Sequence, residues 1–159
     1  MKILICGDSF AADWTIKYPG KGWPNLLAEK HTVTNLAQAG CSEYRIWQQL
    51  KSVDLDKFNS IIVSHTSPYR LFVKNHPVHH SDILHHSSDL IYNDIKDHSK
   101  LNRRLDSIVD YFENYVDLDY LADIHNLICK EIDQLTTGRP VLHITNMDWH
   151  KFYQFKPTI

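Results

Sequence analysis

The feature that most constrains this chain is a short apolar run near its start, Ile3 to Cys6, which ends abruptly at Gly7-Asp8-Ser9. An apolar run without polar alternation is typical of a strand buried on both faces of a parallel sheet. A glycine turn after such a strand places Ser9 at the carboxyl edge of the sheet, where open α/β folds bind ligands. Since Asp and Ser are also common helix caps, the triplet alone leaves a structural role open.

The rest of the chain alternates strand-like and helix-like segments. Strands are predicted at 32–36, 58–64 and 140–145, and helices at 24–30, 42–50, 89–97, 101–116 and 121–135. The long last helix has Asp119 as an expected cap and Gly138 as its stop. This order predicts an α/β fold: a three-layer, flavodoxin-like parallel sheet of about four to five strands with helices on both faces. We expect a single domain over 1–159, with a His-rich insertion at about 71–88.

Composition excludes several classes of partner. The net charge of -2 and the absence of a Lys/Arg cluster argue against nucleic-acid binding. No apolar run approaches the ~20 residues of a membrane helix, and the N-terminus lacks a signal-peptide pattern. The three cysteines are widely spaced, as expected for reduced intracellular thiols. The expected location is therefore the cytoplasm, without a membrane partner.

Two segments carry a resemblance to a known family. Gly7-Asp8-Ser9 after the first strand, and Asn35-Leu36-Ala37-Gln38-Ala39-Gly40 after the second, resemble the first two sequence blocks of the SGNH/GDSL hydrolases. The resemblance covers about the first seventy residues in detail. It implies that Ser9 attacks an ester carbonyl while a histidine takes its proton. It also implies that the amide N–H groups of Ser9 and Gly40 hold the oxyanion, a role that suits a glycine because the backbone can approach closely.

Two later blocks depart from the family pattern. Thr66, within Ser64-His65-Thr66-Ser67, stands where the family has an oxyanion-binding asparagine, and its alternative role is a turn hydroxyl before Pro68. The family's Asp-x-x-His block is matched only by Asp148-Trp149-His150, one residue short. The resemblance makes His150 the general base and Asp148 its orienting group. The fallback base is His143 or a histidine of the insertion at about 71–88, and Asn146 is the fallback orienting group.

Histidine is the compositional oddity of the chain, with eleven residues in all. The predicted insertion holds five of them, together with one nearby carboxylate: His76, His79, His80, Asp82, His85 and His86. Histidines and a carboxylate can bind zinc, but the spacing matches no closed structural zinc pattern and no cysteine pair accompanies it. The expectation is a polar lid beside the site, without a metal or cofactor.

The resulting hypothesis is a serine esterase or acyl-ester hydrolase that works through an acyl-enzyme on Ser9. The resemblance suggests small O-acyl groups on carbohydrates as substrates, with Arg70 available for an anionic substituent. Acyl transfer would use the same residues. The alternative is a catalytically weakened relative that binds a carbohydrate or a protein partner. The pattern shows no last strand or helix for the sheet, so a second copy of the chain could complete its edge as a homo-oligomer.

Overall fold

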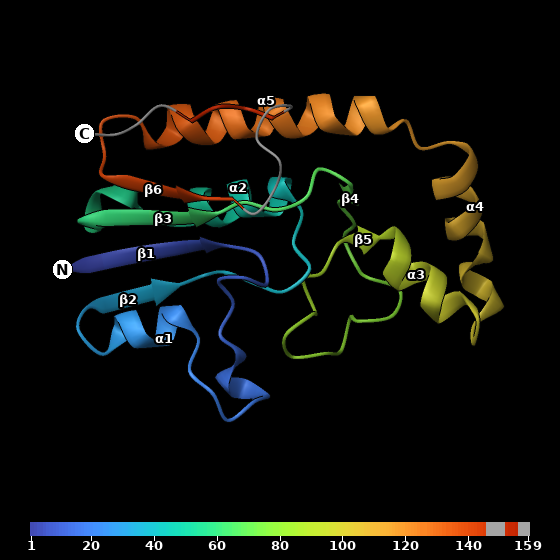
Figure 1. Ribbon diagram of the computed structural model, residues 1–159, viewed down its shortest axis with the longest axis horizontal. Helices are drawn as coiled ribbons and strands as arrows, with labels where there is room; N and C mark the ends of the chain where they lie inside the picture. The colour runs from blue at the N-terminus through green and yellow to red at the C-terminus, as the bar shows by residue number, and fades with distance from the viewer. Residues whose placement is uncertain (146–151, 156–159) are drawn as a thin grey trace.

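The computed structural model describes residues 1–145 and 152–155, and its centre is a parallel sheet (Figure 1). The strand order is β2-β1-β3-β6, and every pair in it is parallel. The strands are β1 (Lys2–Gly7), β2 (Thr32–Asn35), β3 (Ser60–Ser64) and β6 (Val141–Ile144). The α-helices are α1 (Trp23–Ala28), α2 (Glu43–Lys51), α3 (Tyr92–Ser99), α4 (Asp106–Asn114) and α5 (Leu118–Thr136). This architecture confirms the predicted α/β fold class.

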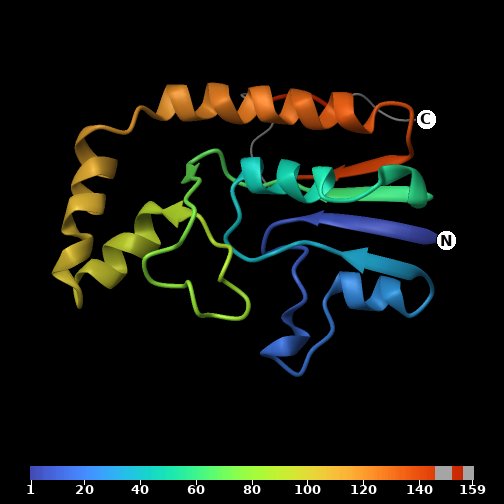
Figure 2. The same cartoon turned by 180° about the vertical axis from the view of Figure 1, so that it is seen from behind.

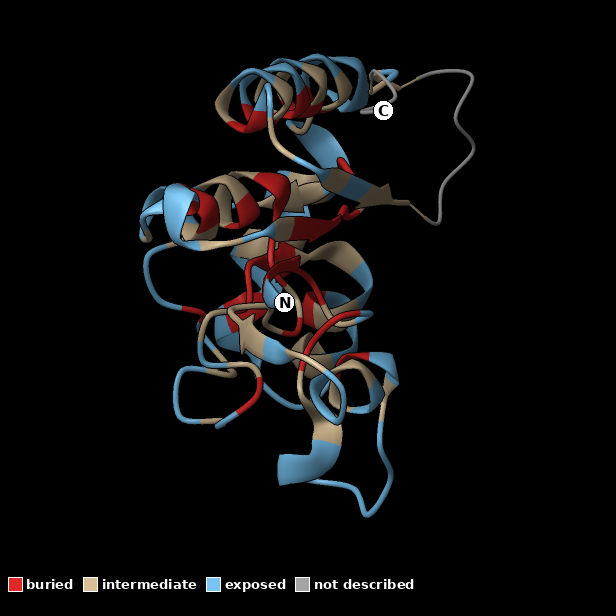
Figure 3. Ribbon diagram, turned by 90° about the vertical axis from the view of Figure 1, so that its left-hand side faces the viewer, coloured by how far each residue is buried: buried red, intermediate tan, exposed pale blue. Residues whose placement is uncertain are grey.

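The two faces of β1 explain its uninterrupted apolar sequence. Leu4 and Cys6 pack into a cluster with residues of α2 and α5. Ile3 and Ile5 point to the opposite face, where Leu27 of α1 joins their cluster. The sheet therefore has helices on both faces, and buried residues concentrate in the strands and on the inward sides of the helices (Figure 3). A strand covered on both sides gains from apolar residues at every position.

The His-rich insertion is part of a longer segment, residues 70–117, that extends beyond the carboxyl ends of the strands and is called the excursion below. Two short antiparallel strands, β4 (Arg70–Leu71) and β5 (Leu90–Ile91), close the base of this segment. Beyond them α3 and α4 pack together around Ile95 and Leu105, in a cluster separate from those of the sheet. Figures 1 and 2 show both helices beyond the strand ends, with α5 leading the chain back over the sheet.

Helix boundaries differ from the sequence prediction in three places. The helix predicted over 101–116 is a 3-10 turn, Arg103–Leu105, followed by the shorter α4, Asp106–Asn114. The helix predicted over 89–97 is shifted to Tyr92–Ser99, because Leu90–Ile91 pair as β5, and the cap of α5 also differs. Asp117, instead of the predicted Asp119, caps α5, because its carboxylate accepts the N–H groups of Asp119 and Tyr120. Gly138 has a φ of 78°, a left-handed conformation that suits glycine just after a helix end, as predicted. Within the described residues, none of the helices combines the length and the apolar character required to cross a membrane.

A buried carboxylate fastens the excursion to the sheet. Asp89 has no exposed surface and accepts hydrogen bonds from Arg45 of α2 at 2.8 Å and from the N–H of Ser42 at 2.8 Å. Its side chain also accepts the N–H of Val73 at 3.1 Å, while its own N–H donates to the carbonyl of Gly40 at 3.0 Å. The turn after β2, the start of α2 and the His-rich segment therefore meet at one residue.

We predict that Asp89→Asn lowers the free energy of unfolding by about 3 kcal/mol, because it leaves the guanidinium of Arg45 largely buried without a counter-charge. Urea titration followed by circular dichroism measures this difference.

Asp97→Asn is the matched control. Asp97 is an exposed residue of α3 that forms an ion pair with Lys100, and solvent screening leaves such surface pairs with little effect on stability. Equal stabilities of the two variants would contradict the anchoring role of Asp89.

Candidate active site

The turn that carries Ser9 is fixed by close packing and hydrogen bonds. A Cβ atom on Gly7 would lie 2.6 Å from Cβ of Ser64 in β3, so the neighbouring strand leaves room only for glycine. The Asp8 carboxylate accepts the N–H of Phe10 at 3.0 Å, and the Asp8 carbonyl accepts the N–H of Ala11 at 3.1 Å. These bonds make a turn typical of Asp and place Ser9, half-buried, at its tip.

Asp8 itself lies at the centre of a polar network. The hydroxyl of Thr66 donates to its carboxylate at 3.0 Å, and the Arg70 guanidinium lies 3.3 Å away. Burial raises the pKa of Asp8, against the lowering effects of the Phe10 N–H, Arg70 and Thr66. In this structure the Thr66 hydroxyl donates to Asp8. The predicted contact between Thr66 and an oxyanion stays a prediction.

Arg70 has a second partner besides Asp8. Its guanidinium also donates to the carbonyl of Cys41 at 2.8 Å, and its side chain is largely buried. Arg70 thus ties the Ser9 turn to the turn that follows Gly40. Its predicted contact with an anionic substituent of a substrate stays a prediction.

Gly40 occupies a position that needs glycine. Its φ is 78°, and a Cβ atom there would lie 2.8 Å from Cβ of Ser88 in the His-rich segment. Within residues 1–145 and 152–155, the amide N–H groups of Ser9 and Gly40 have no hydrogen-bond acceptor. Half-buried donors of this kind are available to a ligand.

A cavity of about 380 Å³ brings Ser9, Gly40 and Arg70 together. Its lining comes from both the sheet edge and the excursion: Ser9, Trp14, Ala39, Gly40, Arg70, His79, His85, Ser88, Asp89, Ile91 and Asp94. The indole N–H of Trp14 donates to the carbonyl of Ser9 at 2.7 Å, so this ring is held against the turn. The His-rich segment therefore forms one wall of the Ser9 cavity.

The predicted acid–base residues are not among the groups described at this cavity. Asp148, His150 and Asn146 lie outside the described residues. The fallback base His143 lies on β6, where its Nδ1 is 2.9 Å from Nε2 of His65 and its ring stacks on Phe155. The structure places His143 in this stack and not in the lining of the Ser9 cavity.

The structure instead brings an unpredicted histidine–carboxylate pair to the cavity wall. Nδ1 of His85 lies 3.0 Å from the carboxylate of Asp82. Asp82-Ile83-Leu84-His85 has the full Asp-x-x-His spacing that Asp148 and His150 lack. That spacing was available in the sequence, but five histidines lie in one segment, and only the structure shows that His79 and His85 are the ones that line the Ser9 cavity.

A second cluster nearby tests the metal hypothesis. Ligand atoms of His76, His79 and Asp94 all lie within 4.8 Å of one another. Nδ1 of His76 accepts the N–H groups of Val78 at 3.2 Å and His79 at 3.1 Å, so the proton of the neutral ring resides on Nε2. That Nε2 lies 3.7 Å from Asp94. The arrangement therefore favours a histidine N–H that faces a carboxylate over a metal-binding lone pair.

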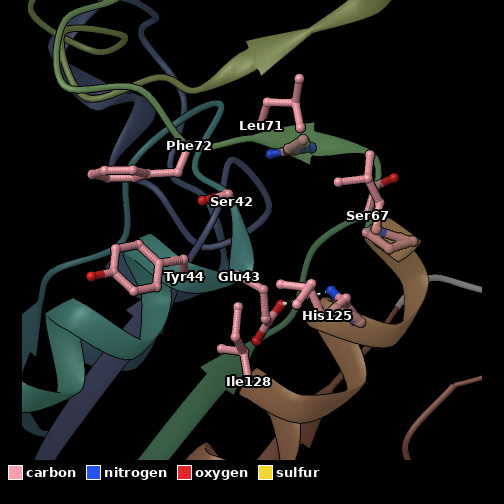
Figure 4. Close-up of a pocket in the computed structure, with 12 residues that line it drawn as sticks. Ser42, Glu43, Tyr44, Ser67, Leu71, Phe72, His125 and Ile128 are labelled. Carbon is pink, nitrogen blue, oxygen red and sulfur yellow. Dashed lines mark ion pairs between the residues drawn. The ribbon is translucent and has the colours of Figure 1, made fainter. Parts of the chain in front are cut away.

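A buried charged network supports the cavity from the side of α2. Glu43 accepts the N–H of Thr66 at 3.1 Å and lies 2.6 Å from Nδ1 of His65. Burial acts to raise the pKa of Glu43, but the charge and hydrogen bond of His65 outweigh it and lower the pKa. Figure 4 shows Glu43 beside His125 in an adjacent pocket of about 310 Å³, which Arg70 also lines.

Comparisons with known proteins give weak structural similarity and no match in sequence. No protein-family model matches the chain, and a search of curated proteins finds no relative. Among solved structures, the acetyl xylan esterase AlAXEase is similar with a TM-score of 0.36 and 12% identity, over 90% of this chain and 77% of that one. A likeness of this size leaves the function to be argued from the geometry of the site.

We predict that acid destabilises the protein between pH 6.5 and 4. Burial lowers the pKa of His76 and of His143 to about 4, from an ordinary value of 6.5. The unfolded chain therefore binds protons in this window that the folded chain does not, and stability falls as the pH falls. Urea titrations at pH 7 and pH 5 should differ by up to about 2 kcal/mol for each histidine.

His143→Gln provides the test of this origin. The variant cannot titrate at this position, so the loss of stability between pH 7 and pH 5 should shrink. A pH dependence identical to that of the wild type would contradict the contribution of His143.

Proposed function

We propose that this chain is a serine esterase or acyl-ester hydrolase that forms an acyl-enzyme on Ser9. The observation that carries the proposal is the convergence of a half-buried serine and two unbonded amide donors, those of Ser9 and Gly40, on one cavity. Two N–H donors beside a nucleophile are what the tetrahedral intermediate of acyl transfer requires. The resemblance to the SGNH/GDSL hydrolases points to the same roles.

The donors are arranged before any substrate arrives. Gly7 against β3 and Asp8 within its network hold the Ser9 turn, while the contact with Ser88 and the bond to Asp89 hold Gly40. Donors that do not reorganise during the reaction stabilise developing charge most effectively, and each contributes ~10²–10³ in rate. Thr66 acts in this scheme mainly through Asp8.

The cavity favours a small, polar ester over a long-chain lipid. Its lining includes the charged groups Arg70 and Asp94 and two histidines, and its volume is about 380 Å³. Trp14 adds an aromatic ring beside Ser9, which suits the apolar face of a sugar. We therefore propose short O-acyl esters of a carbohydrate, such as acetyl esters, as the substrate class.

A second candidate is a weakened relative that binds a carbohydrate or a protein partner. The observation in its favour is Thr66, whose hydroxyl donates to Asp8 and so does not supply a third oxyanion donor in this arrangement. Binding without hydrolysis would then be the function of the same cavity.

The experiment that separates the two candidates is labelling of the folded protein with a fluorophosphonate probe, followed by peptide mass spectrometry. We expect an adduct on Ser9, hydrolysis of 4-nitrophenyl acetate, and loss of both in Ser9→Ala. The reason is that the probe reacts with serines activated for acyl transfer.

Ser52→Ala is the matched control, since Ser52 is an exposed serine at the end of α2, away from the cavity. It should label and hydrolyse as the wild type does. Folded wild-type protein that gives neither an adduct nor hydrolysis would favour the binding function.

A further inference from the structure

We propose that His85 is the general base for Ser9 and that Asp82 positions its ring. This inference rests on the proposed acyl transfer and assigns its acid–base step. It assigns that step to the His-rich segment that forms one wall of the cavity, which the sequence offered only as a fallback to His150.

Backbone hydrogen bonds hold the Asp82 carboxylate in position to accept a hydrogen bond from His85. Its Oδ1 accepts the backbone N–H of Leu84 at 2.8 Å and that of His85 at 3.1 Å, which fixes the carboxylate at the start of the turn. The same oxygen lies 3.0 Å from Nδ1 of His85. The side-chain bond from His85 and the bond from the Leu84 N–H lower the pKa of Asp82, so the group is an ionised acceptor.

These bonds determine the protonation pattern of the neutral imidazole. Since an ionised carboxylate can only accept, the Nδ1 atom of His85 must carry the proton that it shares with Asp82. Its Nε2 then holds the lone pair, and in residues 1–145 and 152–155 this nitrogen has no hydrogen-bond partner. A lone pair held in place by a carboxylate on the opposite nitrogen is suited to remove a proton from a serine.

The pair is tied to the Ser9 turn at two points. His85 and Ser9 line the same cavity, and the His85 ring meets the Trp14 ring edge-on with centroids 6.0 Å apart. Trp14 in turn donates to the carbonyl of Ser9. Lys17, three residues after Trp14, lies 3.3 Å from the carboxylate of Asp82. Trp14 therefore contacts both the Ser9 turn and the His85 ring, and Lys17 contacts Asp82.

His79 also lines the cavity, but its surroundings suit a base less well. Its Nε2 lies 3.1 Å from the carboxylate of Asp94, which also faces His76 at 3.7 Å and His98 at 3.6 Å. The His79 ring stacks on His76, with centroids 4.7 Å apart. Asp94 is thus shared among three histidines, whereas His85 is the one histidine that the described residues place against Asp82.

The proposed step balances without a further co-reactant besides water. Ser9 Oγ bonds to the carbonyl carbon while its proton moves to Nε2 of His85, and the ester oxygen then leaves with that proton as the alcohol. Water next attacks the acyl carbon, giving a proton to Nε2, and the carbon–Oγ bond breaks. Nε2 returns this proton to Ser9, and the carboxylic acid departs.

The test is the rate of Ser9 labelling and of 4-nitrophenyl acetate hydrolysis in His85→Ala. We expect kcat to fall by ~10²–10⁴, the usual contribution of a general base, with an unchanged melting temperature. Added imidazole should restore part of the rate, because it can occupy the space of the missing ring. If His85→Ala does not fold, His85→Gln provides the same comparison without rescue.

His86→Ala is the matched control, since His86 is exposed, adjacent in sequence and outside the cavity lining. It should retain the wild-type rate. A wild-type rate in His85→Ala, with a loss in His150→Ala or His79→Gln, would overturn the assignment while leaving the proposed esterase intact. Absence of any Ser9 adduct in the wild type would overturn both.

Asp82→Asn tests the positioning role. An amide no longer selects the N–H at Nδ1, so kcat should fall ~10-fold or more with KM unchanged, because the residue acts on the base and not on substrate binding. Asp82→Glu should recover part of kcat. A change confined to KM or to the melting temperature would contradict positioning.

Discussion

The buried carboxylate of Asp89 is the contact on which the candidate site depends. It neutralises Arg45 and accepts backbone N–H groups on two sides, while its own N–H binds the carbonyl of Gly40. Removing two charges from water is costly unless every remaining group is bonded, and here the partners are supplied by three separate segments. A polar interaction of this kind also specifies one arrangement of the His-rich segment, since a shifted register would leave the charges unpaired.

Asp8 plays the corresponding part on the other side of the cavity. Its carboxylate meets Thr66 after β3 and Arg70 in β4, and Arg70 reaches on to the carbonyl of Cys41. The loops after β1, β2 and β3 are therefore linked by hydrogen bonds and the Asp8–Arg70 ion pair, at the residue next to Ser9. A parallel sheet brings these loops to one edge, and the polar network fixes their relative positions. Preorganisation of this edge is what the proposed chemistry needs.

The cavity combines two kinds of wall. The sheet edge contributes Ser9 and Gly40 from short turns, in which close packing leaves no room for a side chain at Gly7 or Gly40. The excursion contributes His79 and His85 from its part between β4 and β5, and the pairing of Arg70 with Ile91 closes this part at its base. Their carboxylate partners, Asp94 and Asp82, lie in the same excursion. In the proposed reaction, the nucleophile and the oxyanion donors would belong to the sheet edge, and the acid–base groups would belong to the excursion.

The sequence by itself determined the sheet, because an unbroken apolar strand such as Ile3–Cys6 is stable only when both faces are covered, and it also placed Ser9 and Gly40 at the edge. It could not decide the histidines. The Asp-x-x-His spacing of Asp82 and His85 could be read from the sequence, but spacing alone does not place His85 in the Ser9 cavity. That placement depends on long-range contacts such as Asp89 with Arg45 and Trp14 with Ser9. Periodicity reports burial, whereas the meeting of side chains distant in sequence is decided by tertiary packing.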